Sequence, residues 1–495
     1  MKNEGVGGFR SRGVPRYSLL TPSQVKELHL STLEILETVG VKVMHDEALG
    51  LLKDAGCNVD EEGIVQIPNR LVTEAIQNAP SRVTIYNRNG EEVLYLEGRN
   101  VYFGLGTDLL NTYDLQTGEL RKSNLQDVVD SAVIADYCED IDFIASNGFP
   151  SEVPTNLAYI SIFKALVGNS VKPIYFTAAT GEDLVFILEM AEAVAGGGKK
   201  LKEKPFLIHY AEPTSPLVHS YSAIQKLFMC AEKGIPLNYV PALLSGGTGP
   251  VTLAGAIAVA NAEALSGLVI QQLKAKGSPM ISGFSVTPLD MRYGTTVYGS
   301  PDERLTHTAC TELYHHYGLP VWGEAGCSDS KSFDAQAAIE SAISILMAAM
   351  DGTNLVHNIG YLGQGLIGSA ASIVMCGEII SYVKRIMSGF DMSKVRIDID
   401  TIRQVGPGGH FLSTKQTLEL FREEHWIPKF IDRQDLENWK KRGNLRYEDV
   451  VTQKAIDILK THKPESLPGE VAETLNQIMG KATNRLRDRF LYSSE

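Results

Sequence analysis

Residues 243–281 read LLSGGTGPVTLAGAIAVANAEALSGLVIQQLKAKGSPMI, a glycine-rich turn followed by a long apolar segment. The apolar segment is about long enough to cross a bilayer. Asn261 and Glu263 lie at its centre, however, and a carboxylate there would be costly in lipid. We therefore expect a helix of a soluble protein that is buried on most sides and, being rich in Ala and Gly, packs closely against its neighbours.

The turn before this helix, SGGTGP at residues 245–250, could hold an anion on its amides. It lacks the Lys-Ser/Thr pair of a P-loop and does not match G-x-G-x-x-G. A tight strand-to-helix turn that needs glycine dihedrals explains it as well. We favour the turn and keep a ligand contact as the alternative.

Short β-branched or aromatic runs recur on both sides of this stretch, and each is followed by a helical segment. Such alternation predicts a parallel sheet, and eight units in succession predict a closed (β/α)8 TIM barrel. The alternative, a doubly wound open sheet, rarely needs eight repeats with so little between them. The runs are 100–108, 141–148, 172–179, 205–212, 235–242, 279–286, 319–326 and 353–360.

The regular alternation divides the chain into three parts. Residues 1–99 are expected to form an N-terminal α+β cap, with a helix that begins at the capping box Thr21–Gln24 and a β-hairpin around Asn89-Gly90. Residues 100–390 form the barrel. Residues 391–495, loop-rich and then helical, are expected to be an extension packed on the barrel.

The composition narrows the possible partners. The 495 residues are 44% hydrophobic and carry a formal charge of -13, which argues against nucleic acid because phosphate binding needs a basic face. The six cysteines are scattered without a C-x-x-C pair, and the first residues lack the apolar core of a signal peptide. We expect a cytoplasmic homo-oligomer that binds neither nucleic acid nor a membrane.

In a TIM barrel the active site lies at the carboxyl ends of the strands. The predicted ends are aromatic and acidic and poor in Lys and Arg, a lining that suits a cation better than a sugar phosphate. They carry Thr107, Asp108, Asn147, Phe149, Thr177, Tyr210, Glu212, the 245–248 loop, Ser282, Phe284, Glu324, Cys327, Asp329, His357, Asn358 and Tyr361.

Each of these residues also has a structural interpretation. Trp322 could be a wall residue inside its strand, His357 a hydrogen-bonded core histidine, and Asp329 a helix cap. Glu324 is harder to explain in that way, because a carboxylate near the top of a barrel needs a partner or a task. Cys327 and His357 lack the spacing of metal ligands, so we expect no bound metal.

Three segments resemble the trimethylamine methyltransferase family. They are SGGTGPVTLAGAIAVANAEALSGLVIQQLKAKGSPMI (245–281), SDSKSFDAQAAIESAISILMAAMDGTNLVHNIGYL (328–362) and VGPGGHFLSTKQT (405–417). The similarity covers nearly the whole chain and implies a TIM barrel with extensions. The archetypes carry a pyrrolysine, which this sequence lacks. It is similar instead to the members without pyrrolysine, some of which demethylate glycine betaine or related quaternary amines.

The resemblance implies a methyltransferase of one-carbon metabolism related to methanogenesis. A methyl group would pass from a small quaternary amine to the Co(I) of a corrinoid (cobalamin) on a separate protein, with no cofactor bound by this chain itself. Two alternatives remain: a lyase or metal-dependent hydrolase on the same barrel, and a non-catalytic quaternary-amine binder.

The candidate site follows from these expectations. We take Glu324, Asp329 and His357 as candidate catalytic residues, with His357 as a donor to the carboxylate of a betaine. The turn Val405–Phe411, which contains His410, is expected to fold over the barrel mouth. The candidate substrate-binding residues are Tyr102, Phe103, Phe149, Phe284, Trp322, Tyr361 and His410.

Overall fold

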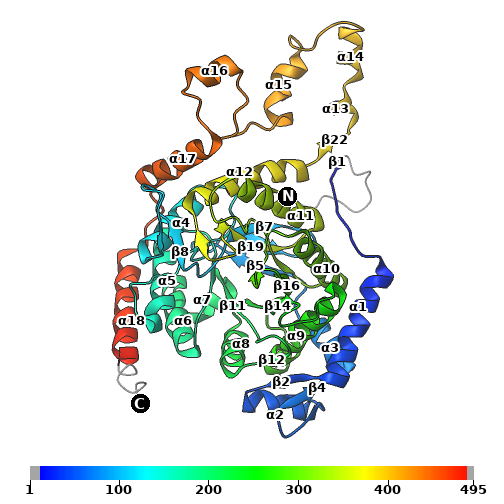
Figure 1. The fold of residues 1–495 in the computed structure, drawn as a ribbon, viewed down its shortest axis with the longest axis vertical. Coiled ribbons are helices and arrows are strands. Elements are labelled where there is room, and N and C mark those ends of the chain that lie inside the picture. The colour runs from blue at the N-terminus through cyan, green and yellow to red at the C-terminus, as the bar shows by residue number, and fades with distance from the viewer. Residues whose placement is uncertain (1–11, 488–495) are drawn as a thin grey trace.

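A ring of parallel strands forms the centre of the molecule, as the computed structural model of residues 12–487 shows (Figure 1). Among the described residues the ring has eight strand positions, and each lies inside one of the eight predicted runs. They are β7 (Tyr102–Leu105), residues 143–144, β10 (Ile174–Phe176), β11 (Leu207–Ala211), β13 (Leu237–Tyr239), β15 (Met280–Ile281), β18 (Trp322–Glu324) and β19 (Leu355–Ile359).

The ring consists of two parallel sheets. One has the order β10-β11-β13-β15 and the other the order β18-β19-β7. Single parallel bridges connect them, Ser282 to Val321 on one side and Gly104 to Phe143 and Ile144 to Ile174 on the other. The strand order thus returns to its start, and the predicted TIM-barrel fold is confirmed, with two arcs joined at single bridges rather than one continuous ladder.

Eight helices follow the strands in turn and surround the ring, as Figure 1 shows. This is the arrangement expected when each parallel strand is connected to the next by a crossover helix. The helices are α4 (Leu125–Tyr137), α5 (Thr155–Asn169), α6 (Gly181–Ala195), α8 (Tyr221–Lys233), α9 (Leu253–Lys274), α10 (Pro301–Tyr317), α11 (Ala335–Asp351) and α12 (Ala370–Met387). The short helix α7 (Gly198–Glu203) follows α6.

Helix α9 is the apolar segment from which the fold was predicted. It is long and apolar enough to span a membrane, yet 16 of its 22 residues are buried inside the protein. Glu263 accepts a hydrogen bond from Ser215 at 2.7 Å. Gly267 lies so close to Tyr239 that a Cβ there would be 2.5 Å from the ring. The prediction of a closely packed core helix is confirmed.

The N-terminal residues form small helices and antiparallel strands beside the ring. Helix α1 (Pro22–Glu34) begins at Thr21, whose side chain accepts from the amide of Gln24 in the predicted capping box. A π-helix, η1 (Ile35–Val39), continues it to Gly40. The predicted hairpin around Gly90 joins β5 (Val83–Tyr86) to β6 (Glu92–Leu96). Between them lie β2 (Val41–Val43), α2 (Asp46–Asp54), β3 (Asn58–Val59), β4 (Ile64–Gln66) and α3 (Asn69–Asn78).

Two small sheets extend the loops at the carboxyl ends of the ring strands. One contains β14 (Ala242–Ser245), β16 (Ser285–Asp290) and β17 (Thr295–Thr296). The other contains β20 (Tyr361–Leu362), β21 (Ile367–Gly368), β8 (Asn111–Tyr113) and β9 (Leu120–Lys122). A further short strand, β12 (Val218–His219), pairs with β2 and so attaches the N-terminal sheet to the barrel.

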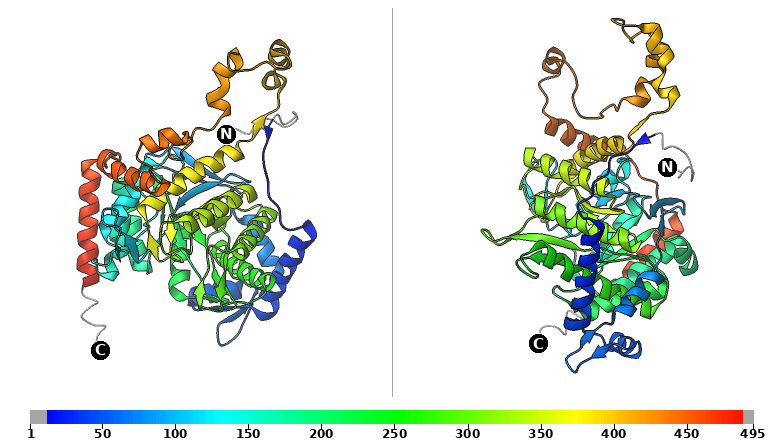
Figure 2. Two further views of the ribbon diagram at one scale, coloured as in Figure 1. Left: turned by 45° about the horizontal axis from the view of Figure 1, so that its top comes forward. Right: turned by 90° about the vertical axis from the view of Figure 1, so that its right-hand side faces the viewer.

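After α12 the chain leaves the ring as an arm, residues 390–446. Strand β22 (Phe390–Asp391) pairs with β1 (Arg12–Gly13) at the start of the arm. Figures 1 and 2 show the arm extending away from the ring of helices. The last helices return, α17 (Tyr447–Thr461) to α12 and α4, and α18 (Gly469–Arg487) to α5 and α6. The arm contains α13 (Lys394–Ile397), α14 (Ile399–Val405), α15 (Lys415–Glu424) and α16 (Leu436–Lys441).

The placement of Val405–Phe411 over the barrel mouth is corrected by this arrangement. The segment is the turn between α14 and α15 on the arm, and its residues from Pro407 onward are exposed. Gly406 and Gly408 have φ of +66° and +82°, which allow the chain to reverse there. The glycines therefore serve a helix–helix turn, and His410 lies exposed on the arm. The division of the chain at residues 99 and 390 remains our proposal.

Candidate active site

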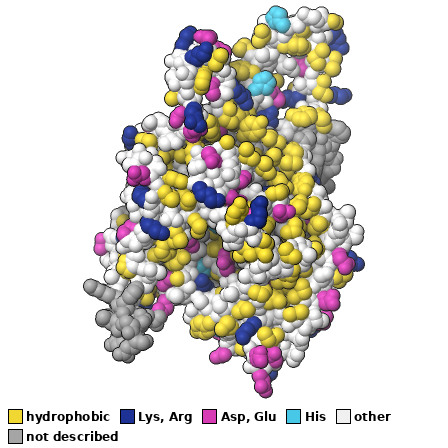
Figure 3. Space-filling model, viewed as in Figure 1, with side chains coloured by type: hydrophobic (Ala, Val, Ile, Leu, Met, Phe, Trp, Pro, Cys, Tyr) yellow, Lys and Arg dark blue, Asp and Glu magenta, His cyan; other side chains and the backbone are white. Residues whose placement is uncertain are grey.

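A cavity of about 420 Å³ lies at the carboxyl ends of the ring strands. Figure 3 views the molecule from this side, and acidic, basic and histidine side chains are visible in its central hollow. The residues that line the cavity are Thr107, Asp108, Tyr159, Thr177, Ala178, Tyr210, Ala211, Glu212, Lys226, Tyr298, Glu324, His357, Asn358, Tyr361 and Gly365.

Four tyrosines form much of the wall. Tyr210 lies near the end of β11, and Tyr361 follows β19 in the short strand β20. Tyr159 comes from α5, and Tyr298 comes from the loop before α10. The Tyr361 hydroxyl donates to the carbonyl of Thr107, and a Cβ at Gly106 would collide with the Tyr361 ring. A glycine at the end of β7 is thus what lets this aromatic face stand in the mouth. Such faces attract cations.

Two carboxylates with raised pKa stand at the rim. Burial raises the pKa of Asp108 to about 6, although Thr177 donates to it at 3.1 Å. Glu212 is open to the water of the cavity, but protein atoms surround its carboxylate within the concave mouth. That burial, with the charges of Glu324 and Asp108, raises the pKa of Glu212 to about 7. The pKa of Asp108 is raised by burial alone, whereas the pKa of Glu212 is raised by burial and by neighbouring negative charge.

Lys226 is the sole Lys or Arg among the residues that line the cavity. It comes from α8, and its Nζ donates to the carbonyl of Ala178 at 2.8 Å. Burial lowers its pKa. With three carboxylates and one ammonium, the mouth favours a ligand that brings positive charge.

Glu324 is the most rigidly held of the three carboxylates. It accepts hydrogen bonds from Ser285 Oγ at 2.6 Å and Asn358 Nδ2 at 2.7 Å, and His307 Nε2 lies 3.2 Å away. Burial acts to raise the pKa of Glu324, but the hydrogen bond and charge of His307 outweigh it, and the pKa lies below its ordinary value. Glu324 is therefore a fixed anion at the cavity floor.

A charged cluster beneath the floor supports that anion. Burial lowers the pKa of His307, but its hydrogen bonds with Glu303 and Glu324 outweigh burial and raise it. Glu303, His307 and Glu324 bring their ligand atoms within 4.8 Å of one another, a spacing that could hold a metal ion. Arg304 Nη2, however, already lies 2.6 Å from Glu303 Oε2. The two carboxylates thus face the Arg304 guanidinium and the His307 ring, which offset their charge without a metal.

His357 is buried at the floor with both ring nitrogens lacking a hydrogen-bond partner among the described residues. Its ring centroid is 4.6 Å from that of Tyr175, so aromatic contacts hold it in place. Burial lowers its pKa to about 4, and the ring is neutral at physiological pH. A buried polar group without a partner is unusual in a folded protein, and here it lines a cavity. This points to a ligand that completes the hydrogen bond.

Of the ten candidate catalytic and substrate-binding residues, the structure brings three to the cavity: Glu324, His357 and Tyr361. Asp329 stands behind them and accepts from the amides of Tyr298 and Gly299, both at 2.9 Å. It therefore holds the loop that presents Tyr298 to the cavity.

The other predicted aromatic residues lie outside the cavity lining. Phe103 and Phe284 are buried in the core, and Trp322 lies one layer below the floor with its ring 5.9 Å from that of His357. Phe149 packs behind Tyr159, with ring centroids 5.7 Å apart. The Tyr102 hydroxyl accepts from the amide of Tyr95 in the N-terminal hairpin.

Several lining residues were not among our candidates. Asp108, Thr177, Tyr210, Glu212 and Asn358 had a usable signal, since each lies at a predicted strand end. Tyr159, Lys226 and Tyr298 come instead from two helices and a loop, and only the packing of these elements around the ring shows that they reach the mouth. The 245–248 loop is likewise not among the lining residues; it forms the tight turn that we favoured.

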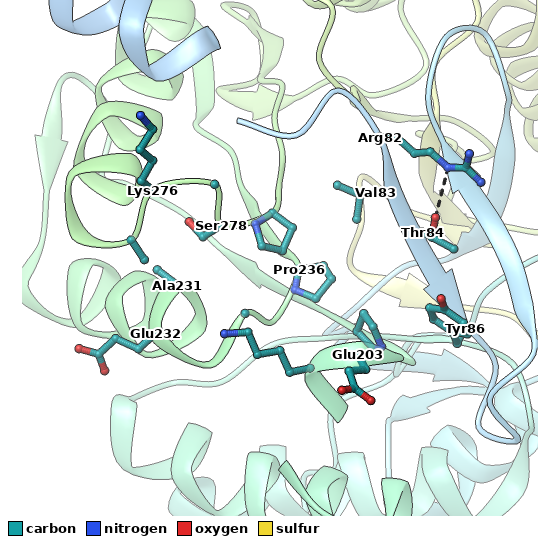
Figure 4. Close-up of a pocket in the computed structure, with 16 residues that line it drawn as sticks. Arg82, Val83, Thr84, Tyr86, Glu203, Ala231, Glu232, Pro236, Lys276 and Ser278 are labelled. Carbon is teal, nitrogen blue, oxygen red and sulfur yellow. Dashed lines mark hydrogen bonds between the residues drawn. The ribbon is translucent and has the colours of Figure 1, made fainter. Parts of the chain in front are cut away.

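A second cavity of about 400 Å³ lies at the opposite end of the ring (Figure 4). Pro205, Pro236 and Pro279, each just before a ring strand, line it together with the β5–β6 hairpin residues Arg82 and Thr84. It therefore marks the amino-terminal face, which in TIM barrels serves stability rather than chemistry. We therefore take the cavity at the carboxyl ends as the candidate active site.

The family described as Trimethylamine methyltransferase (MTTB) matches residues 4–486. The chain belongs to the trimethylamine methyltransferase family. The resemblance seen in the sequence is thereby confirmed, and so is the predicted class of enzyme, a methyltransferase.

Individual relatives span almost the whole chain. The trimethylamine methyltransferase MttB of Desulfitobacterium hafniense (strain DSM 10664 / DCB-2) is 32% identical over 483 residues, 97% of this chain and 96% of that protein. MttB of Methanosarcina thermophila is 33% identical over 482 residues, 96% of this chain and 99% of that protein. A glycine betaine methyltransferase of Desulfitobacterium hafniense (strain Y51) is 30% identical over 447 residues, 88% of this chain and 93% of that protein.

Among solved structures, the chain is similar to the monomethylamine methyltransferase MtmB of Methanosarcina barkeri. The TM-score is 0.51 with 11% sequence identity, and the match covers 96% of this chain and 88% of that chain. At this identity the likeness supports the fold alone. The cytoplasmic location and the oligomeric state remain predictions.

Proposed function

We propose that this methyltransferase moves a methyl group from a betaine, such as glycine betaine, to the Co(I) of a corrinoid carried by a separate protein. The observation that carries the proposal is the lining of the mouth cavity, four tyrosine faces and three carboxylates with one lysine. A small zwitterion with a permanent cation complements that lining, because its cation suits the tyrosines and carboxylates and its carboxylate suits the lysine.

The tyrosines and Glu324 suit the quaternary ammonium end. A permanent cation accepts no hydrogen bond at nitrogen, so π-faces and nearby negative charge must offset its desolvation. Cation–π contacts contribute about 0.5–2 kcal/mol each. Glu324 is held ionised at the floor by His307, so it adds negative charge without taking a proton from the substrate.

Lys226 and His357 suit the carboxylate end. Lys226 supplies the positive charge, and His357 supplies an N–H that has no partner among the described residues. His410, one of the candidate substrate-binding residues, is exposed on the arm and is not part of the proposed site. The two ends of a betaine would then bind side chains of opposite charge within one cavity.

The chemistry needs little from the protein at the leaving nitrogen. As the carbon–nitrogen bond breaks, its electron pair stays on nitrogen and the product is a neutral tertiary amine, so no general acid is required. The corrinoid supplies the nucleophile when its carrier protein docks at the mouth. Because positive charge decreases during the reaction, the carboxylates contribute to binding more than to the chemical step. The protein accelerates methyl transfer by orienting one methyl group of the substrate toward the mouth.

The mouth fits an acceptor that arrives on another protein. Among the described residues that line the cavity, His357 is the one histidine, and it is buried at the floor. The described lining also contains no cysteine. The exposed part of the mouth thus offers carboxylates and hydroxyls rather than a resident ligand for cobalt. A lyase or metal-dependent hydrolase is not favoured, because the cluster beneath the floor is already balanced by Arg304 and His307.

The test is a methyl-transfer assay with purified corrinoid proteins in the Co(I) state, followed by their absorbance. Glycine betaine, proline betaine, carnitine, trimethylamine and tetramethylammonium are compared as donors. We expect methylated corrinoid with at least one betaine and less with tetramethylammonium, which lacks the carboxylate. Turnover of trimethylamine alone would contradict the proposal. Binding of betaines without turnover by any corrinoid protein would support the non-catalytic alternative.

A further inference from the structure

The arm, residues 390–446, has no hydrophobic core. None of its 57 residues is buried, although it contains four helices. Of the 32 large hydrophobic residues that are exposed in the described chain, 14 belong to the arm. Val395 and Leu412 are each 84% exposed and Leu418 is 74% exposed. Figure 3 shows hydrophobic side chains along the arm and over the surface at its root.

Within residues 12–487, the hydrogen bonds and ring contacts between the arm and the body lie at the root of the arm. Within the described chain, β22 pairs with β1, and Glu378 of α12 accepts hydrogen bonds from the amides of residues 429–431. Trp426 packs on Tyr382 of α12, with ring centroids 5.1 Å apart. These contacts fix where the arm leaves the barrel, but they cover little of its apolar surface.

The helices of the arm are too short to be stable alone. The longest, α15, has 10 residues, and isolated helices of fewer than about 12–15 residues are marginal in water. Helices with an uncovered apolar face gain their stability from packing on another surface. The arm therefore needs a cover that is present all the time. A methyl acceptor that must arrive and leave in each cycle does not meet that need, whereas a second copy of the same chain does.

The body carries an apolar face that could receive the arm. Ile339 and Ile343 of α11 are 58% and 52% exposed, and being four residues apart they lie on one face of the helix. Outer helices of a barrel usually present polar residues to solvent. This face lies on the body rather than the arm, so the two surfaces can be exchanged between two molecules.

We propose that the arm of one molecule packs on the α11 face of a second copy, and that the second arm packs on the first. Size supports this, because a standard interface uses about 20–30 residues a side and the arm offers 57. Charge supports it too. The arm has 11 Lys and Arg against 9 Asp and Glu, whereas the whole chain has 46 against 59, so a slightly basic arm meets an acidic body. Such reciprocal exchange is an isologous contact with two-fold symmetry.

The first experiment measures the mass of the full chain by size exclusion with light scattering at micromolar concentration. We expect a multiple of 54.1 kDa for the native sequence and a monomer for Val395→Asp/Leu418→Asp and for Ile339→Asp/Ile343→Asp. Val251→Asp is the matched control, because Val251 is 72% exposed and belongs to neither the arm nor α11. A native monomer, or assembly that survives either double substitution, overturns the proposal.

Hydrogen–deuterium exchange keeps the test clear if a variant folds poorly. In the native chain, amides of α14 and α15 should be protected, and the protection should be lost in Ile339→Asp/Ile343→Asp, which leaves the arm sequence intact. Unprotected arm amides in the native chain would refute the proposal. Neither measurement uses substrate, so the result is independent of the proposed function.

Discussion

His307 Nε2 lies 3.2 Å from Glu324 Oε2, and this contact connects the outer helix α10 to the floor of the mouth cavity. Each member shifts the pKa of the other toward the charged form. The negative charge that faces the cavity is therefore set by a residue that does not line it.

Replacing His307 by Gln should weaken cation binding. Without the imidazolium, burial raises the pKa of Glu324, and part of the anion is lost near neutral pH. We expect the Kd for tetramethylammonium to rise about tenfold, the change that corresponds to about 1.4 kcal/mol. Titration calorimetry at several pH values measures it. His316→Gln, an exposed histidine of the same helix, is the control. Equal affinities in both variants would show that the contact is only structural.

The affinity for a quaternary ammonium should depend on pH through Glu212. The pKa of Glu212 is raised to about 7 in the free protein, and the cation binds the ionised form. Affinity should therefore rise with pH up to about 7, level off above it, and fall by up to tenfold per pH unit below it. In Glu212→Gln this dependence should shrink toward that of Asp108, whose pKa is about 6. An unchanged pH profile in the variant would exclude Glu212 as the titrating group.

Stability should show the opposite trend with pH. A carboxylate whose pKa is raised on folding binds its proton more tightly in the native state. Its contribution to stability is full below the ordinary pKa and is lost as pH rises through the raised value. Buried histidines such as His357 titrate in the opposite sense, so the native chain is compared with Glu212→Gln at each pH. Relative to that variant, the native protein should lose melting temperature between pH 5.5 and pH 8. Saturating glycine betaine should reduce this loss, since the ligand cation stabilises the ionised form.

Lys226 should distinguish betaines from plain cations. Lys226→Met removes the counter-charge for the carboxylate end, and hydrogen bonds to charged groups contribute about 1.5–3 kcal/mol. We expect the Kd for glycine betaine to rise at least tenfold while that for tetramethylammonium stays equal or falls. Lys233→Met, an exposed lysine of the same helix, should change neither value. Parallel losses for both ligands would remove Lys226 from the proposed site.

Replacing His357 by Phe should affect stability and ligand binding in opposite directions. His357→Phe fills the same space and removes two buried nitrogens that lack partners in the described chain. The free protein should then be as stable as the native one or more stable, because an unsatisfied buried polar group costs about 1–3 kcal/mol. Binding of glycine betaine should weaken more than binding of tetramethylammonium. A clear fall in the melting temperature would identify His357 as a satisfied core residue instead.

Gly267 should be intolerant of even one methyl group. Alanine favours a helix interior over glycine by about 1 kcal/mol, but a Cβ at position 267 would lie 2.5 Å from the Tyr239 ring. Overpacking of that kind costs about 1–3 kcal/mol, so Gly267→Ala should be net destabilising. Gly480→Ala in α18, where a Cβ meets nothing within 4 Å, should be neutral or stabilising. Thermal unfolding of both variants gives the comparison.

The strands could be predicted because each one is a short apolar run between turns in the sequence. Eight such runs in succession are compatible with only a few folds. The same reasoning placed Glu324, His357 and Tyr361 at the mouth. It failed for Trp322 because residues two apart in a strand share a face, so Trp322 points inward like Glu324 but one layer lower.

Residues outside the strands could not be placed in this way. Tyr159, Lys226 and Tyr298 reach the cavity from α5, α8 and a loop, and no local pattern encodes how far a helix extends over the ring. The position of the arm was even harder to predict from the sequence. Its glycines and His410 are as suitable for a lid as for a helix–helix turn, and only tertiary packing decides between them.

The single bridges that join the two arcs of the ring have a consequence for substrate choice. Glu324 lies in β18 and Tyr361 follows β19, both strands of the arc β18-β19-β7. Tyr210 lies in β11 of the arc β10-β11-β13-β15, and the helix that carries Lys226 follows that strand. A betaine bound in the proposed manner would thus hold one arc with its ammonium and the other with its carboxylate. The relative position of the two arcs would then set the distance between the ammonium site and the carboxylate site. A betaine would bind well only if its two charges are separated by that distance. Selectivity among betaines of different length would be a property of the scaffold rather than of any one side chain.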